Sequence, residues 1–243
     1  VEAAGVPVRP GAHALRMTQD RLAERRFIAG LGIHTAPWRE VTDEGDIRAA
    51  AAELGTPLRL KAPIGGYDGR SQVRIATTGE IPGALERLAG PPRAPGTPHL
   101  VERELDHAME LSVITARALD GSLAAFPISR NVHDAGILVE SAAPAPLDPV
   151  VAAAATALGA RIAEALGVVG LVTAELFLLR DGTLVVNELA PRVHNSGHWT
   201  IEGARTSQFE QHLRAVLGWP LGSPAARGHA AMLNAIGALP PRE

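Results

Sequence analysis

Two Asp-Gly pairs, each between runs rich in apolar and β-branched residues, constrain the fold more than any other feature of this sequence. The pairs are Asp120-Gly121 and Asp181-Gly182. Asp-Gly suits the tight turn of a β-hairpin because its residues readily adopt positive φ. The second half of the chain is therefore expected to contain antiparallel sheet. The expected strands cover residues 109–118 and 122–128 around the first turn, and residues 172–179 and 183–188 around the second.

The rest of the chain alternates predicted helices with short predicted strands. Thr18 or Asp20 can cap a helix whose apolar residues recur at helical spacing and which ends at residues 30–32. The mixture indicates an α+β fold class. Further helices are expected at residues 44–54, around 81–88, at 150–166 and at 208–217, and further strands at 34–41, 58–61, 72–76, 99–102, 137–142 and 230–236.

The composition excludes several classes of function. With 243 residues, 46% of them apolar, the chain can bury the core of one large domain or of two closely packed lobes. A formal charge of −3 creates no field that would draw it to nucleic acid or to an anionic membrane. It has no cysteine, which excludes disulfides and thiolate chemistry. No apolar run approaches the ~20 residues of a membrane span, and the first residues lack a signal-peptide pattern, so a soluble, cytoplasmic protein is expected.

A glycine-rich loop at residues 65–72 follows Lys61, a lysine in a chain whose cationic residues are nearly all arginine. Glycines let backbone N–H groups approach an anion, and an ammonium group can bridge two phosphates. The loop alone is better explained as a flexible hairpin, and the lysine alone is equally well explained as a solvated strand end. Because the lysine lies on the strand that leads into the loop, we expect a phosphate-binding site here.

Glu175 and Glu188 lie on the two predicted strands of the second hairpin. A hairpin can bring two carboxylates onto one face, and carboxylate oxygens suit Mg²⁺ that also bridges to nucleotide phosphates. The spacing alone favours two exposed hairpin charges over a metal site.

The segment after Glu188 decides between these interpretations, because residues 194–200 collect hydrogen-bonding side chains without any amphipathic period. Its two histidines, His194 and His198, have no third ligand at a recognisable zinc spacing. Hydrogen bonding to a polar substrate is therefore the favoured role for this segment.

Three groups of residues together resemble the N5-carboxyaminoimidazole ribonucleotide synthases, a family of ATP-grasp ligases. They are residues 35–38, Lys61 with residues 65–72, and residues 187–200 followed by residues 207–212. The similarity extends from about residue 19 to residue 236. It implies two α+β lobes that clamp ATP between antiparallel sheets: a small lobe at 18–104 with a phosphate lid loop, and a large lobe at 105–243 with the metal and substrate site. Residues 1–17 would be the remnant of an N-terminal α/β domain and its linker.

The resemblance also implies a reaction and its participants. Members of this family phosphorylate bicarbonate with ATP to carboxyphosphate and transfer the carboxyl unit to 5-aminoimidazole ribonucleotide, in purine biosynthesis. The implied cofactors are ATP and Mg²⁺, and the implied partners are these small molecules and, for the full-length protein, a second copy in a homodimer.

The roles of individual residues follow from the same resemblance. Glu175 and Glu188 would ligate Mg²⁺, Lys61 and Arg21 would contact the ATP phosphates, and Glu110 would take the ribose. The substrate and catalytic residues would be Tyr67, Asp68, Arg70, Arg192, His194, Asn195 and Ser196. The ATP-binding residues would be Arg21, Lys61, Gly66, Tyr67, Asp68, Gly69, Arg70, Ser71, Gln72, Glu102, Arg103, Glu104, Leu105, Glu110, His133, Asn187 and Glu188.

The chain departs from the family pattern in three respects. Ser71 replaces a usual glycine of the loop, and Ala190 stands where many ATP-grasp enzymes have a metal-binding Asn, so metal ligation is expected to rest on the two glutamates. The family also has an N-terminal α/β domain and a C-terminal domain that are not present in full. We therefore expect a fragment that alone binds MgATP weakly and turns over little or no aminoimidazole ribonucleotide.

Two other interpretations remain open at this point. The formate-dependent glycinamide ribonucleotide transformylases are sister ATP-grasp enzymes with a similar Pro-Arg-x-His segment, although residues 36–38 and 66–70 favour the carboxylating enzymes. A non-catalytic ATP-binding module is the other interpretation, and Lys61, Glu175 and Glu188 argue against it.

Overall fold

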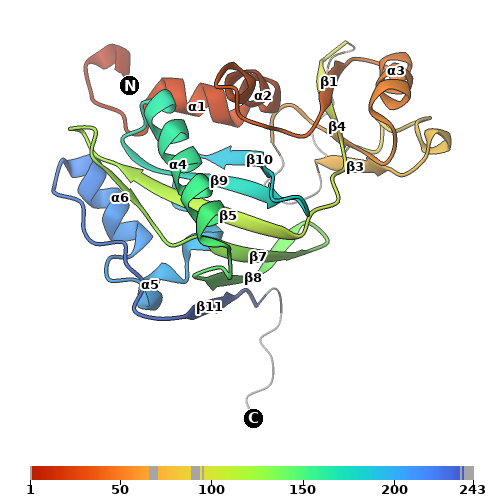
Figure 1. Ribbon diagram of the computed structural model, residues 1–243. Helices are drawn as coiled ribbons and strands as arrows, with labels where there is room; N and C mark the ends of the chain where they lie inside the picture. Colours follow the sequence, from red (N-terminus) through yellow and green to blue (C-terminus); the bar gives the residue numbers. More distant parts are fainter. Residues whose placement is uncertain (1, 66–70, 89–93, 95, 236, 238–243) are drawn as a thin grey trace.

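The chain forms two antiparallel sheets that lie beside each other, with helices over the larger one (Figure 1). The computed structural model describes residues 2–65, 71–88, 94, 96–235 and 237. Mixed helices and antiparallel sheets confirm the predicted α+β class.

The four-stranded sheet has the order β1-β4-β2-β3. Helix α3 packs on it, begins after its N-cap Asp43 and ends at Gly55, whose φ is 77°. Ile47 of α3 packs with Leu58 and Leu60 in a core made of residues between 41 and 101. The elements are β1 (Trp38–Val41), α3 (Glu44–Leu54), β2 (Leu58–Lys61), β3 (Gln72–Ile75) and β4 (His99–Arg103).

The seven-stranded sheet has the order β10-β9-β5-β7-β8-β11, and β6 pairs with the free part of β5. Both predicted hairpins are present, since β5 pairs with β6 and β9 with β10 around the two Asp-Gly turns. Its strands are β5 (Met109–Arg117), β6 (Leu123–Ala125), β7 (Ser129–Asp134), β8 (Ile137–Ala143), β9 (Gly170–Leu178), β10 (Leu184–Ala190) and β11 (Ala230–Leu233).

Side chains of the central strand β5 alternate between two cores, as the period of two in a strand requires. Leu111 and Val113 pack with residues of helices α1, α2 and α4. Ile114 faces the other way and packs near Trp199. The helices are α1 (Ala12–Gln19), α2 (Arg21–Gly30), α4 (Pro149–Leu166), α5 (Thr200–Gly203) and α6 (Gln208–Leu217), with short 3₁₀ turns η1 (Glu2–Ala4), η2 (Thr78–Glu80) and η3 (Asn195–Gly197).

Three segments differ from the predicted secondary structure. Residues 82–88 form turns rather than a helix, because Pro82 is followed by Gly83 at a φ of 67°. Helix α1 was not expected, and its N-cap Gly11 has no side-chain oxygen to mark the start. Strand β7 was not expected either, because its sequence is mostly polar.

The structure also distributes the first 33 residues differently from the expected lobes. Ala14 of α1 and Ile28 of α2 belong to the core of the seven-stranded sheet, and so does Ile33. The predicted linker at 1–17 thus ends inside a packed helix, and the predicted small lobe at 18–104 contributes its first helix to the large lobe. The predicted start of the large lobe at residue 105 lies in the connection from β4 to β5.

Helix α4 has the length and hydropathy of a membrane span, by those criteria alone. It is the one such helix within the described residues. Its residues Ala155, Gly159, Ile162 and Leu166 are buried, and the helix contacts β5 and β9. This packing explains its apolar face as part of the core.

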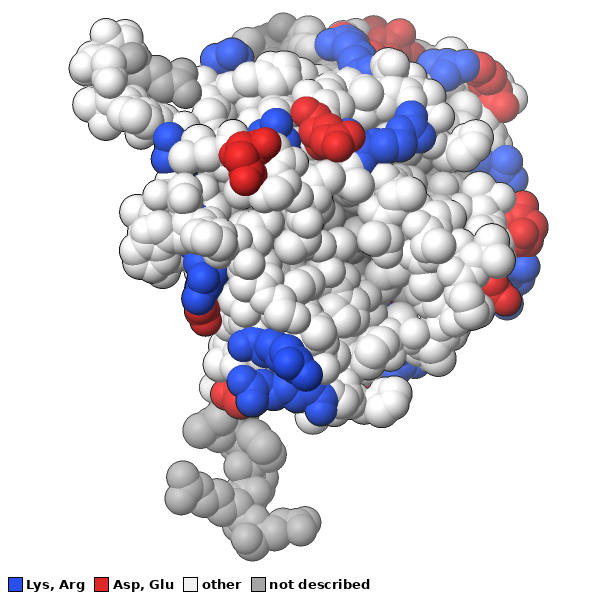
Figure 2. All heavy atoms as spheres, turned by 60° about the vertical axis from the view of Figure 1, so that its left-hand side comes forward, with Lys and Arg blue, Asp and Glu red and all other residues white. Residues whose placement is uncertain are grey.

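Helix α6 has an exposed apolar stripe. Phe209, Leu213 and Leu217 are spaced by four residues and are 39%, 56% and 55% exposed. The side of the molecule where α6 lies comes forward in Figure 2, and that face is largely uncharged, with acidic and basic side chains mainly near its margins. Exposed apolar surface of this kind is typical of contact surfaces.

We predict that Gly159→Ala destabilises the protein although alanine favours helix. A Cβ at Gly159 would lie 2.5 Å from Val113 Cγ1 and 2.8 Å from Thr115 Oγ1. Overpacking costs about 1–3 kcal/mol, which exceeds or cancels the ~1 kcal/mol gained in helix propensity. Urea unfolding should show no gain in stability.

Gly30→Ala is the matched control, because a Cβ there meets nothing within 4 Å. Its stability should stay level or rise by some tenths of a kcal/mol. A gain for Gly159→Ala as large as that for Gly30→Ala would contradict the close packing of α4 on β5.

Candidate functional site

Part of the seven-stranded sheet is polar on the face away from α4, opposite the apolar core that contains α4. Glu175 on β9 pairs with Ser112 of β5, whereas its neighbours Ala174 and Leu176 point into the apolar core. Because alternate residues share a face, Glu175 and Phe177 lie on the side away from α4. This polar face is where the predicted site residues of β5, β7, β9 and β10 meet.

A β-bulge turns Glu188 onto the same face. Val186 pairs with Leu176 and Glu188 with Glu175, so Asn187 is an extra residue in β10. In a regular ladder Asn187 would pair with Glu175 and Glu188 with Ala174, so Glu188 would face the core as Val186 does. Bulges commonly re-aim a side chain beside an active site.

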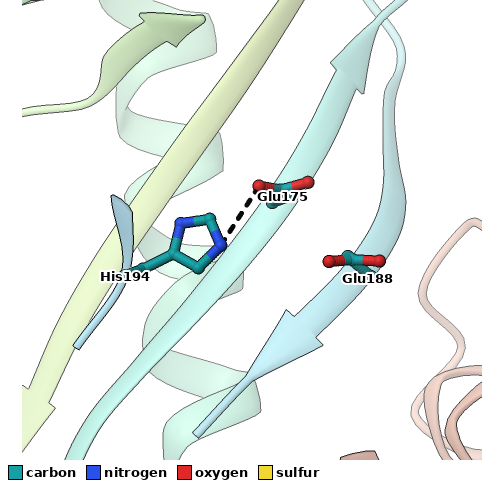
Figure 3. A group of neighbouring side chains, drawn as sticks. All are labelled: Glu175, Glu188 and His194. Carbon is teal, nitrogen blue, oxygen red and sulfur yellow. Dashed lines mark ion pairs between the residues drawn. The ribbon is translucent and has the colours of Figure 1, made fainter. Parts of the chain in front are cut away.

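The predicted metal ligands Glu175 and Glu188 converge with His194 (Figure 3). Ligand atoms of all three lie within 4.8 Å of one another. His194 Nε2 is 3.4 Å from Glu175 Oε1, and the two side chains are only 11% and 13% exposed. His194 Nδ1 accepts a hydrogen bond from Ser196 N at 3.3 Å, which assigns its hydrogen to Nε2, facing Glu175.

The electrostatics of this cluster fit a hard cation. Burial, together with the nearby Glu188 carboxylate, raises the pKa of Glu175 to about 8. Burial, together with Arg192, lowers the pKa of His194 to about 4, so its imidazole is neutral. Two close carboxylates without a cation are therefore poorly stabilised, and oxygen ligands of this kind suit Mg²⁺. The sequence had not indicated that His194 joins the two glutamates.

Lys61 lies between the two sheets, close to the carboxylates of the site. It is the only lysine of the chain. Its ammonium pairs with Glu102 and donates to Asn187 Oδ1 at 3.4 Å. Burial opposes ionisation of Glu102, but Lys61 and Arg25 hold its pKa at about 2. The ion pair with Glu102 thus holds the Lys61 ammonium beside the bulge of β10.

Arg25 completes this network and was missed in the sequence. Its guanidinium is 1% exposed and pairs with Glu24 at 3.1 Å and with Glu102 at 2.8 Å. It also donates to the Asn187 carbonyl oxygen at 2.7 Å. Its spacing in the sequence could have indicated its burial, because it lies on the apolar face of α2, three residues after Leu22 and three before Ile28.

Arg21 holds the base of the predicted lid loop. Its guanidinium donates to the carbonyl oxygens of Ala62 at 3.1 Å and Gly65 at 2.6 Å. The lid residues Gly66, Tyr67, Asp68, Gly69 and Arg70 lie outside the described residues. Ser71 and Gln72 return the chain into β3, where Ala62 N donates to Ser71 O at 3.0 Å.

The predicted adenine segment, residues 102–105, runs from β4 toward β5. Glu102 is buried, whereas Glu104 points to Arg59 and Arg74 at 2.6 and 2.9 Å. Arg103 is exposed, and the carbonyl of Leu105 contacts His107.

Glu110 and His133, both predicted at the nucleotide, contact each other directly on β5 and β7. Although burial works in the opposite direction, Glu110 raises the pKa of His133. His107 Nε2 also approaches Glu110, at 3.2 Å. His107 had not been singled out in the sequence.

The predicted substrate segment after β10 is held rigidly. Gln208 of α6 accepts from His194 N at 2.9 Å and donates to His194 O at 2.7 Å. Ser196 is fully buried, and Asn195 begins the 3₁₀ turn η3. Arg192 is exposed and donates to Val193 O at 2.9 Å. Gln208 is a second residue missed as functional, since only its tertiary contacts reveal its role.

Comparison with known proteins agrees with this geometry. A family model described as ATP-grasp domain matches residues 26–209. The chain is 44% identical over 236 residues to the N5-carboxyaminoimidazole ribonucleotide synthase of Pseudomonas aeruginosa, covering 97% of this chain and 63% of that protein. The synthase of Brucella melitensis is also 44% identical, over 95% of this chain and 62% of its own length. The chain thus spans less than two thirds of these relatives.

Solved structures give the same result. The N5-carboxyaminoimidazole ribonucleotide synthetase of Thermus thermophilus has a TM-score of 0.88 and 42% identity over 98% of this chain and 63% of its own. The Aspergillus clavatus enzyme, solved with ADP and 5-aminoimidazole ribonucleotide, has a TM-score of 0.88 and 31% identity over 97% of this chain and 61% of its own. The chain therefore belongs to the ATP-grasp family, and within that family it is similar along nearly its whole length to N5-carboxyaminoimidazole ribonucleotide synthases.

Proposed function

We propose that this chain carries the nucleotide-binding and carboxylate-activating site of an N5-carboxyaminoimidazole ribonucleotide synthase. The protein would use ATP and bicarbonate to carboxylate 5-aminoimidazole ribonucleotide, a step of de novo purine biosynthesis. The observation that carries the proposal is the convergence of Lys61, Asn187, Glu188 and Glu175 at the junction of the two sheets. An ammonium group beside paired carboxylates is the arrangement that a metal-bound polyphosphate requires.

In the first step, a bicarbonate oxygen forms a bond to the γ-phosphorus of ATP and the bond to the ADP oxygen breaks. Glu175 and Glu188 would hold Mg²⁺, which neutralises phosphate charge when bound. Lys61 would bind phosphate oxygens, and its ion pair with Glu102 holds the ammonium in place. The proposed step requires no covalent nucleophile, because positioning and electrostatics are sufficient for phosphoryl transfer.

In the second step, the exocyclic amine of 5-aminoimidazole ribonucleotide forms a bond to the carboxyl carbon of carboxyphosphate. Phosphate leaves and the amine loses a proton. Arg192, His194, Asn195 and Ser196 would bind the acceptor and the carboxyl group together with the lid residues Tyr67, Asp68 and Arg70. The neutral His194 ring, fixed through Gln208, offers a hydrogen-bond donor without adding charge.

The proposal has three further parts. Mg²⁺ is inferred from the carboxylate geometry. A homodimer stays a prediction, with the exposed stripe on α6 as one available contact surface. The cytoplasmic location also stays a prediction, based on the kind of reaction.

The reaction is tested with the protein encoded by the complete reading frame that contains this chain. The measured quantity is the rate of ADP release. Release should require bicarbonate and 5-aminoimidazole ribonucleotide, and formate with glycinamide ribonucleotide should not replace them. Glu188→Gln should lower the rate roughly 10²-fold or more, because it removes charge at the phosphates. Glu202→Gln, at an exposed glutamate of α5, is the control and should keep the wild-type rate. Faster turnover with formate would overturn the proposal.

The metal site is tested through its dependence on pH. Glu175 binds its proton more tightly in the folded chain, with a pKa of about 8 against an ordinary 4.5. That contribution to stability is full below pH 4.5 and is lost as pH rises toward 8. Without divalent cation, wild type should lose stability relative to Glu175→Gln between pH 5.5 and 8, by at most about 1.4 kcal/mol per pH unit.

Urea unfolding of both proteins measures this difference. Mg²⁺ should restore the stability of wild type at pH 8, because it binds the ionised carboxylates, and should have less effect on Glu175→Gln. A stability difference that is the same at both pH values would show that Glu175 titrates normally and would contradict the proposed paired site.

A further inference from the structure

His107 lies in the connection that joins the two sheets. This connection leaves β4 at Arg103 and enters β5 at Met109. It is anchored at both ends, since Glu104 N donates to Pro57 O at 3.0 Å and Ala108 N donates to Leu178 O at 2.7 Å. The backbone around His107 is therefore fixed with respect to both sheets.

The imidazole of His107 stacks on Phe177 of β9. The ring centroids are 4.5 Å apart and the planes differ by 21°. Phe177 pairs with Glu110 across β5 and β9, so both lie on the polar face of the sheet. The stacking orients the edge of the imidazole toward Glu110.

Both nitrogens of His107 have a partner in the predicted nucleotide site. Nδ1 is 3.2 Å from the Leu105 carbonyl oxygen, and a carbonyl only accepts, so Nδ1 carries a hydrogen. Nε2 is 3.2 Å from Glu110 Oε1, a pairing made by the imidazolium form, in which Nε2 also carries a hydrogen. One ring thus holds the carbonyl of the predicted adenine segment and the carboxylate of the predicted ribose ligand.

The Glu110 carboxylate is held from two sides. Oε1 faces His107 and Oε2 faces His133 Nδ1. The three side chains are 29%, 25% and 22% exposed, so a ligand can reach them. A carboxylate has about four acceptor positions, and the two imidazoles use two of them. The two that remain match the two hydroxyl donors of a ribose.

We infer that His107 is a positioning residue that sets the recognition of the ribose hydroxyls of the nucleotide. This inference rests on the proposed ATP site. His107 acts through Glu110, because it fixes the direction of the free lone pairs of that carboxylate. It also acts through Leu105, because it holds the Leu105 carbonyl in the predicted adenine segment. Loss of its nitrogens leaves Glu110 held by His133 alone and weakens selection for a 2′-hydroxyl.

The test compares binding of MgATP and Mg-2′-deoxy-ATP by calorimetry. His107→Phe keeps a ring on Phe177 but removes both nitrogens. Wild type should bind ATP more tightly than 2′-deoxy-ATP, and His107→Phe should reduce that ratio about 10-fold or more, the scale of a hydrogen bond to a charged group. His107→Gln retains an N–H donor toward Glu110 and should recover part of the ratio.

Arg180→Gln is the matched control. It removes the exposed ion pair of Arg180 with Asp106, the residue before His107, without touching Glu110. Its ATP to 2′-deoxy-ATP ratio should equal that of wild type. A merely structural role of His107 would lower both affinities equally and leave the ratio unchanged.

The outcomes distinguish the role of His107 from the existence of the ATP site. If wild type binds ATP in preference to 2′-deoxy-ATP and His107→Phe shows the same preference, the role of His107 is overturned and the ATP site stands. If His107→Phe does not fold, an unchanged ratio in His107→Asn, which cannot reach Glu110 in the same way, overturns the role. If wild type binds neither nucleotide, the proposed function itself is overturned, and the role of His107 with it.

Discussion

The guanidinium of Arg25 is almost completely buried and bonds to three elements of the fold at once. It pairs with Glu24 on its own helix, with Glu102 on β4 and with the Asn187 carbonyl on β10. A buried charge is costly unless its partners remain in place, and removing one partner leaves the others uncompensated. The position of α2, the four-stranded sheet and the edge of the seven-stranded sheet therefore depend on one another through this residue.

Arg25 affects the candidate site through two of these contacts. Glu102, held by Arg25, in turn fixes the Lys61 ammonium between the sheets. The Asn187 carbonyl belongs to the extra residue of the β10 bulge, and that bulge puts Glu188 opposite Glu175. A single buried cation thus positions both the lysine proposed to bind phosphate and the second carboxylate proposed to bind metal.

The sequence was a good guide where local chemistry determines structure. Helices α3 and α6 have the predicted bounds because Asp43 and Ser207 cap them and Gly55 and Gly218 end them. Lys61, Glu175 and Glu188 could be proposed as ligands because they lie on strands next to recognisable turns. Strand β7 and helix α1 could not be predicted, since the first lacks alternation and the second lacks a capping side chain.

Long-range contacts account for what the sequence did not reveal. Arg25 meets Glu102 and Asn187 across 77 and 162 residues, and Gln208 meets His194 across 14. The role of His107 depends on Phe177 of β9, on which its ring stacks. In the sequence alone such residues look like ordinary helix or loop positions, because their partners are distant in the chain.

Replacing Arg25 tests most directly whether the buried network organises the site. Arg25→Met should lower the free energy of unfolding by about 3–5 kcal/mol and weaken MgATP binding at least tenfold, because Glu102 and the bulge lose their cation. Arg26→Met removes only an exposed ion pair with Glu40 and should change stability by less than about 1 kcal/mol. If Arg25→Met matched Arg26→Met in both urea unfolding and MgATP affinity, the network would not hold the site together and the account would be wrong.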